Sequence, residues 1–207
     1  MPITRALLPC AGLGSRMNMD YNKSKEMLLD AQGKPLIQHH LDLCTKYELS
    51  PLVITRAEKV DLIDHCLSQK VNVLLIQPKG EWMDTLLAST KMWENDNILL
   101  LPDTRFSPDS IIGDVKNSLA LGNLSVLALH QVDDVSKWGS VKNYTIVEKK
   151  SSIDKGWAWG IMGFKKSEGI RLLEGMRKKG VPISLKDSGF VYLDSFKDVT
   201  RTGILEC

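Results

Sequence analysis

The first stretch of the sequence that could do chemistry is Leu7–Met17, LLPCAGLGSRM, in which an apolar run leads into two glycines and an arginine. Gly12 and Gly14 can adopt positive φ and admit a ligand close to the backbone, so successive amides could face phosphate oxygens. Arg16 would add a permanently charged, forked donor. A tight turn after a buried strand is the plain alternative, because a lone GxG is a weak signal. The GxGxxG dinucleotide pattern is incomplete, since Met17 stands at its third glycine, and no Gly-Lys-Ser/Thr of a P-loop follows.

Short apolar runs alternate with segments of helical period along the first 130 residues. This alternation predicts a three-layer α/β domain with a mainly parallel sheet, in which ligands bind beyond the carboxyl ends of the strands. The loops after Leu8, Ile76 and Leu101 would then share one edge. The expected strands are Thr4–Leu8, Leu52–Thr55, Val71–Ile76, Asn97–Leu101 and Leu124–Leu129, and the expected helices are Pro35–Tyr47, Lys59–Gln69, Trp82–Trp93 and Ser107–Leu121.

The pattern changes after about residue 130. Strands are predicted over Ser140–Glu148, Trp157–Phe164 and Gly189–Leu193, and a helix over Lys166–Lys179. Trp157 and Trp159 would share one strand face by the two-residue period, either in the core or as a platform for a sugar.

Composition limits the function classes. A chain of 207 residues fits one domain with a full core. Lys plus Arg number 27 against 25 for Asp plus Glu, so we expect neither nucleic acid nor a membrane surface as a partner. The sequence shows no long apolar stretch and no signal-peptide pattern, which predicts a cytoplasmic protein. The four cysteines lack CxxC spacing, which argues against a zinc site.

The glycine-rich stretch is followed by a lysine motif, Lys23–Leu29 (KSKEMLL), and by Gly33–Ile37 (GKPLI). This order resembles the sugar-phosphate nucleotidylyltransferase family, and within it the uridylyl- and thymidylyltransferases that act on glucose 1-phosphate. Weaker matches follow in family order at Gln77–Leu86, Leu99–Asp103, Trp138-Gly139, Ile146–Lys149, Trp159–Phe164 and Tyr192–Asp194.

The resemblance implies a three-layer α/β/α Rossmann-like nucleotidyltransferase fold in a single domain. Residues 1–130 would bind the nucleotide and residues 131–207 the sugar phosphate. The implied reaction joins UTP or dTTP to a sugar 1-phosphate with release of pyrophosphate, and Mg²⁺ is the implied cofactor. Because both reactants are anions, catalysis would consist mostly of positioning and charge neutralisation.

The resemblance also assigns roles to individual residues. Lys25 would reach the α-phosphate, and Asp103 would hold Mg²⁺, which takes one or two carboxylates together with phosphates and waters. The implied catalytic residues are Arg16, Lys25 and Asp103; the nucleotide-binding residues are Ala11, Gly12, Gly14, Ser15, Gln77 and Gly80; the sugar-phosphate-binding residues are Gly139, Glu148 and Lys149; and the metal ligands are Asp103 and Asp194.

Several alternatives stay open on sequence alone. Asp103 could be a helix N-cap, Asp194 could cap a segment beginning at Ser195, and Lys25 could be a solvated lysine. Ser24 stands where the family usually has proline before the lysine, so the aim of Lys25 is in question. Two other functions remain: a cytidylyltransferase acting on an alcohol or polyol phosphate, and a non-catalytic module that binds nucleotide sugars. The sequence also leaves homo-oligomerisation open.

Overall fold

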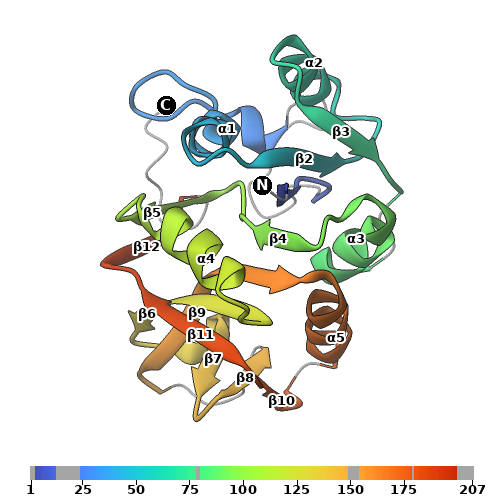
Figure 1. Ribbon diagram of the computed structural model, residues 1–207. Helices are drawn as coiled ribbons and strands as arrows, with labels where there is room; N and C mark the ends of the chain where they lie inside the picture. The colour runs from blue at the N-terminus through green and yellow to red at the C-terminus, as the bar shows by residue number, and fades with distance from the viewer. Residues whose placement is uncertain (1–2, 13–23, 78–79, 149–153, 179, 200–207) are drawn as a thin grey trace.

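A ten-stranded mixed sheet organises the computed structural model, which describes residues 3–12, 24–77, 80–148, 154–178 and 180–199 (Figure 1). Its order is β10-β8-β7-β9-β4-β1-β2-β3, and β6 pairs with β9 and with β11. The strands β1 (Thr4–Pro9), β2 (Ser50–Thr55), β3 (Asn72–Leu75) and β4 (Asp96–Leu99) run parallel to one another. This agrees with the predicted α/β class and mainly parallel sheet.

The second half of the sheet is mixed. The long strand β9 (Gly156–Lys165) runs antiparallel to β4 and to β6 (Ser125–Val132), and β11 (Ser188–Tyr192) runs parallel to β6. The strands β7 (Gly139–Lys142), β8 (Thr145–Glu148) and β10 (Ile183–Ser184) complete this side. Because β9 lies between β4 and β6, these two strands point the same way.

Helices cover both faces of the sheet, which gives the three predicted layers (Figure 1). One core cluster joins the sheet to α1 (Leu36–Lys46), α2 (Val60–Ser68) and α4 (Ile111–Ala120). The other core cluster joins the opposite face to α3 (Trp82–Ala88) and α5 (Lys166–Met176). Short 3-10 turns η2 (Lys25–Met27), η3 (Thr90–Met92) and η4 (Val135–Lys137) connect the larger elements.

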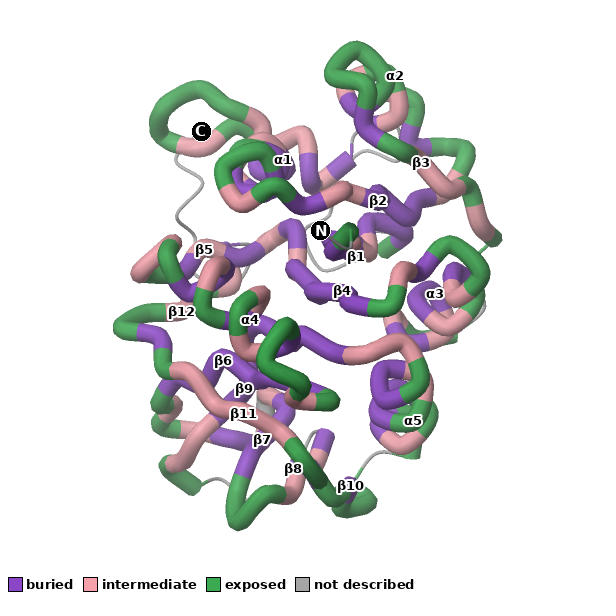
Figure 2. The backbone as a smooth tube through the Cα atoms, viewed as in Figure 1, coloured by how far each residue is buried: buried purple, intermediate pink, exposed green. Residues whose placement is uncertain are grey.

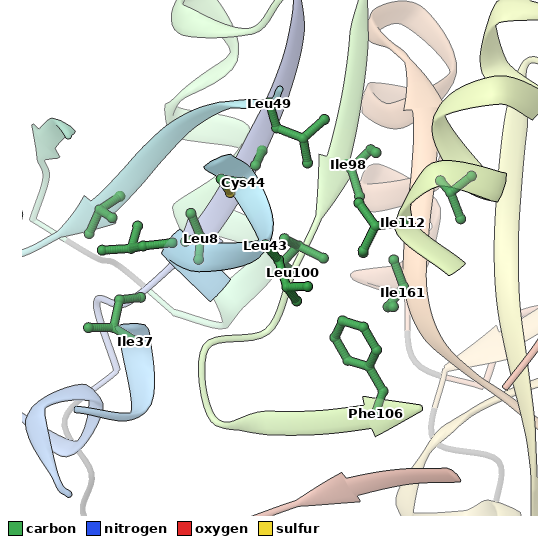
Figure 3. Packing of buried hydrophobic residues seen from close by; sticks show 14 of the residues in the cluster. Leu8, Ile37, Leu43, Cys44, Leu49, Ile98, Leu100, Phe106, Ile112 and Ile161 are labelled. Atoms are coloured by element: carbon green, nitrogen blue, oxygen red, sulfur yellow. The ribbon is translucent and has the colours of Figure 1, made fainter. Parts of the chain in front are cut away.

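Alternating residues of the central strands are buried in opposite clusters. On β1, Ala6 and Leu8 face the first cluster and Leu7 faces the second. Figure 3 shows the first cluster, where Ile98 and Ile161 of neighbouring strands meet Ile112 of α4. The inner strands are accordingly buried along most of their length (Figure 2). Burial on both faces explains the continuous apolar runs of the sequence.

Three predicted elements differ from the structure. The segment 140–148 is a hairpin, because Asn143 (φ 50°) and Tyr144 (φ 54°) form a two-residue turn between β7 and β8. The predicted helix from Ser107 begins only at Ile111, after a strand β5 (Thr104–Ser107) that pairs antiparallel with β12 (Ser195–Asp198). The helix of 82–93 breaks after Ala88 and continues as η3.

The two tryptophans of β9 share one face, as the two-residue period predicts. Both belong to the second core cluster, where Trp159 is buried and Trp157 is half-buried. A β-bulge between Ala128 and Leu129 shifts the register in which β6 pairs with β9, next to Trp159. No helix within the described ranges is both long and apolar enough to cross a bilayer.

Candidate active site

The carboxyl ends of β1 and β4 lie side by side at one edge of the sheet, since Leu7 pairs with Leu99 in a parallel register. After β1 the chain passes through Ala11, which is buried, to Gly12, which is exposed; among the described residues beyond its chain neighbours, none has a heavy atom within 4 Å of the place a Cβ would take. The open side of Gly12 could therefore receive a ligand against the backbone. Gly14, Ser15 and Arg16 lie outside the described residues.

Lys25 and Asp103 meet at this edge although they are 78 residues apart in sequence. Lys25 Nζ donates to Asp103 Oδ2 at 2.5 Å, and each side chain keeps about a fifth of its surface exposed, 18% and 19%. Burial lowers the pKa of Lys25, but the charges of Asp103 and Glu26 outweigh burial and raise it. Lys25 is therefore an ammonium at neutral pH, available to a phosphate.

The structure excludes a helix N-cap at Asp103, because Thr104 begins β5 and α4 starts at Ile111. Strand β12 runs antiparallel to β5, so the Val199 amide donates to the Asp103 carbonyl at 3.0 Å. Asp103 is thus fixed through its backbone while its carboxylate binds Lys25.

Asp194 lies at the opposite end of the β5–β12 ladder from Asp103. Its side chain is exposed and its amide donates to the Ser107 carbonyl at 2.8 Å. The structure does not bring the two predicted metal ligands together, and the described part of the chain holds no group of three or more His, Cys, Asp or Glu that could bind a metal. Asp103 alone still fits Mg²⁺, a hard cation that can take one carboxylate together with phosphate oxygens and waters.

Ser24, which stands where the family usually has proline, is held by two hydrogen bonds to Asp61. Its amide donates to Asp61 Oδ2 at 3.0 Å and its hydroxyl donates to Asp61 Oδ1 at 2.5 Å. Next to Lys25 on the other side, Glu26 is fully buried and accepts from Lys59 Nζ at 2.7 Å. Sequence reasoning missed Glu26, Lys59 and Asp61. Glu26 stands within the lysine motif, but the other two belong to no motif.

Gln77 and Gly80 both precede α3, which begins at Trp82. Gln77 is the second residue after β3 and is exposed. Gly80 has φ +100°, and a Cβ there would overlap the carboxylate of Asp84, which accepts from the Glu81 amide at 2.9 Å and caps the helix. The glycine is therefore needed for the helix start, and its contact with a nucleotide base stays a prediction.

The predicted sugar-side residues Gly139 and Glu148 pair across the β7–β8 hairpin. The indole of Trp159 lies directly over Gly139: an added Cβ would overlap the ring and come within 2.7 Å of Glu148 Oε2. Trp159 Nε1 is buried without a hydrogen-bond partner among the described residues, and its ring packs 5.9 Å from that of Trp82. The space against Gly139 is filled by this indole. Lys149 lies outside the described residues.

A cavity of about 540 Å³ lies where β6 ends and β9 begins, on the edge of the sheet that carries Asp103. Lys155 and Asp133 form an exposed ion pair of 3.0 Å on its wall, and Trp157 lies beside them. The volume is within the range of small-molecule sites.

No family model matches the chain. Among curated proteins, 2-C-methyl-D-erythritol 4-phosphate cytidylyltransferase of Haemophilus influenzae (strain PittEE) is 25% identical over 150 residues, or 72% of this chain. The aligned region spans 65% of that relative's length, less than two thirds.

Solved structures match over nearly the whole chain. A protein of Bacillus anthracis assigned as a glucose-1-phosphate thymidylyltransferase, in complex with a sucrose, has a TM-score of 0.77 at 18% identity and covers 98% of this chain and 92% of its own. UDP-glucose pyrophosphorylase of Acinetobacter baumannii has a TM-score of 0.68 at 16% identity and covers 98% and 90%. At such identities the likeness shows the fold alone. The chain has the Rossmann-like nucleotidyltransferase fold that these sugar-phosphate nucleotidylyltransferases share.

Proposed function

We propose that the protein is a nucleotidylyltransferase that joins a nucleoside triphosphate to the phosphate of a sugar or a related polyol and releases pyrophosphate. The observation that carries the proposal is the contact of Lys25 with Asp103 beside the glycine loop after β1, at the carboxyl edge of the sheet. In an open α/β sheet this edge is where ligands bind.

The proposed reaction needs no protein nucleophile. An oxygen of the acceptor phosphate attacks the α-phosphorus, the new P–O bond forms, and the bond to the β-phosphate breaks as pyrophosphate leaves. The Lys25 ammonium would stabilise the charge on the α-phosphate, where hydrogen-bond donors act most strongly in the transition state. Backbone amides around Gly12 would hold the other phosphates.

Asp103 is the residue proposed to hold Mg²⁺. The ion would supply charge neutralisation and orientation of the phosphates. The Val199 amide fixes the backbone of Asp103, from which the carboxylate would extend to the reacting groups. The β5–β12 register leaves Asp194 too far along the ladder to share this role, and we assign the metal to Asp103.

UTP or dTTP with a sugar 1-phosphate is the first candidate substrate pair. Gln77 would read the base, and Gly139 with Glu148 would bind the acceptor. Arg16 and Lys149 would add charge at the two phosphates.

CTP with a polyol phosphate is the second candidate, and one observation favours it. Trp159 fills the space against Gly139, one of the residues expected to bind the acceptor. The aligned relative is named for a cytidylyl transfer to an acyclic polyol phosphate.

A pyrophosphate-release screen tests the proposal. The protein is incubated with Mg²⁺, each of UTP, dTTP and CTP, and a panel of sugar 1-phosphates and polyol phosphates. Turnover with one pair is expected and identifies the substrate. Nucleotide binding detected by thermal shift, with no turnover for any pair, would support the non-catalytic module instead.

Two variants test the assigned roles. Lys25→Met and Asp103→Asn should each lower kcat by roughly 10²–10³-fold, as loss of a transition-state charge contact does. Lys165→Met is the matched control, since Lys165 binds Asp96 at 2.7 Å at the opposite end of β4. Equal kcat values for Lys25→Met and Lys165→Met would contradict the role of Lys25.

A further inference from the structure

Three consecutive side chains of the turn around η2 reach two different parts of the fold. Lys25 extends to Asp103 at the sheet edge, whereas Ser24 and Glu26 bind residues at the start of α2. The turn itself is short. Two bonds close it, from the Met27 amide to the Ser24 carbonyl at 2.9 Å and from Leu28 to Lys25 at 3.2 Å. So short a turn needs tertiary contacts to stay formed.

The contact of Ser24 with Asp61 uses both donors of the serine. The amide and the hydroxyl each donate to a different carboxylate oxygen, and Ser24 is buried. A proline at this position could make neither bond, because it lacks an N–H and a hydroxyl. Burial raises the pKa of Asp61, yet the bonds from Ser24 outweigh this and lower it, so Asp61 is ionised at neutral pH.

Glu26 ties the other side of the turn to α2. Its carboxylate is fully buried and accepts from Lys59 Nζ at 2.7 Å, while Lys59 itself is 8% exposed. Asp61 and Lys59 are two residues apart at the start of α2. Asp61 accepts hydrogen bonds from Ser24, which precedes Lys25, and Lys59 binds Glu26, which follows Lys25.

We propose that Asp61 and Lys59 are positioning residues that hold Lys25 against Asp103. This inference rests on the proposed function for its catalytic meaning. A flexible lysine side chain loses rotamer entropy when it is fixed, and a backbone held on both sides of Lys25 adds no further freedom to the place from which that side chain extends. The Ser24–Asp61 contact does here what a rigid residue before the lysine would do.

Asp61→Ala is the first test. It should lower kcat roughly 10- to 100-fold, because small misplacements of a reacting group cost that much, while the KM for nucleotide changes less than about threefold. Ser24→Ala, which keeps the amide bond and loses only the hydroxyl bond, should give a smaller loss. The matched control is Asp64→Ala, which removes an exposed aspartate of the same helix.

A proline rescue separates positioning from general damage to α2. Ser24 has φ −77°, within the range that proline adopts. In the Asp61→Ala background, Ser24→Pro should restore kcat at least tenfold, because the ring fixes φ where the lost carboxylate had fixed it. A purely structural role of Asp61 in α2 predicts no such rescue.

A readout without substrate keeps the inference separate from the proposed function. The modification rate of Lys25 by an amine-specific reagent is measured by peptide mass spectrometry and divided by that of exposed Lys91. The ratio should rise several-fold in Asp61→Ala and return in the double variant. If it matches Asp64→Ala throughout, the inference is wrong. If it follows the expected series while no protein turns over any substrate, the positioning stands and the proposed function is wrong.

Discussion

The buried ion pair of Glu26 and Lys59 allows a quantitative prediction about stability. Glu26 has no exposed surface, and Lys59 is its charge partner at 2.7 Å. Lys59→Met keeps most of the side-chain volume but leaves the carboxylate buried without that partner. Breaking a buried pair in this way costs about 3–5 kcal/mol of the free energy of unfolding. That loss is a large part of the roughly 5–15 kcal/mol available to a domain.

The pH dependence of this loss identifies its cause. Burial raises the pKa of Glu26, while Lys59 and Lys25 lower it, and the net shift is upward. Lys59→Met removes the positive charge that lowers the pKa of Glu26 most, so burial raises that pKa further. Since the protonated acid tolerates burial, the loss in Lys59→Met should shrink as pH falls toward that raised pKa.

Urea unfolding followed by tryptophan fluorescence at pH 7.5 and pH 5.5 measures both effects. The double variant Glu26→Gln/Lys59→Met should recover most of the stability, because it removes both charges. Lys155→Met is the control for an exposed pair and should change the free energy of unfolding by less than about 1 kcal/mol. A loss below about 1 kcal/mol in Lys59→Met at pH 7.5, or an equal loss at both pH values, would refute the reasoning.

Three further predictions concern single positions. Burial lowers the pKa of His130 from 6.5 to about 4, so the wild type should lose about 3 kcal/mol of unfolding free energy between pH 6.5 and pH 4, and His130→Phe should not show this loss. If urea unfolding gives both proteins the same change in unfolding free energy over this pH range, the prediction is wrong. Gly12→Ala should leave the melting temperature unchanged, because its Cβ would contact none of the described residues beyond its chain neighbours, yet weaken nucleotide binding in a titration; unchanged affinity would remove Gly12 from the site. Gly139→Ala should displace the indole of Trp159 and cost about 1–3 kcal/mol, and an unaltered fluorescence spectrum would count against that packing.

The sequence predicts the layers of the fold well, because they depend on local patterns. Apolar runs of parallel strands are buried on both faces, and Leu7 and Leu8 show this in neighbouring positions. The rule that parallel strands end at one edge places Asp103 at the carboxyl edge, whereas the choice of Lys25 depends on the family resemblance and its contact with Asp103 appears only in the structure. The roles of these residues in nucleotidyl transfer remain predictions.

What the sequence does not predict depends on pairings between distant segments. Strand β5 has only four residues, and the helix predicted from Ser107 overlaps only the last of them, so the sequence shows no separate strand there. The Asn143-Tyr144 turn lacks the glycine that usually marks a two-residue hairpin. Asp61 belongs to no sequence motif, because its role depends on hydrogen bonds with Ser24, which is 37 residues away in the sequence.

The antiparallel strand β9 has a consequence for how the proposed substrates would enter and leave. It pairs with β4 on one side and with β6 on the other, so the parts of the chain before and after residue 130 share one continuous sheet. A hinge between the halves would have to break these backbone bonds, and their amides should exchange with solvent only when the whole sheet unfolds. Any closure around the proposed substrates would therefore fall to the loops at the carboxyl edge, with the sheet unchanged beneath them.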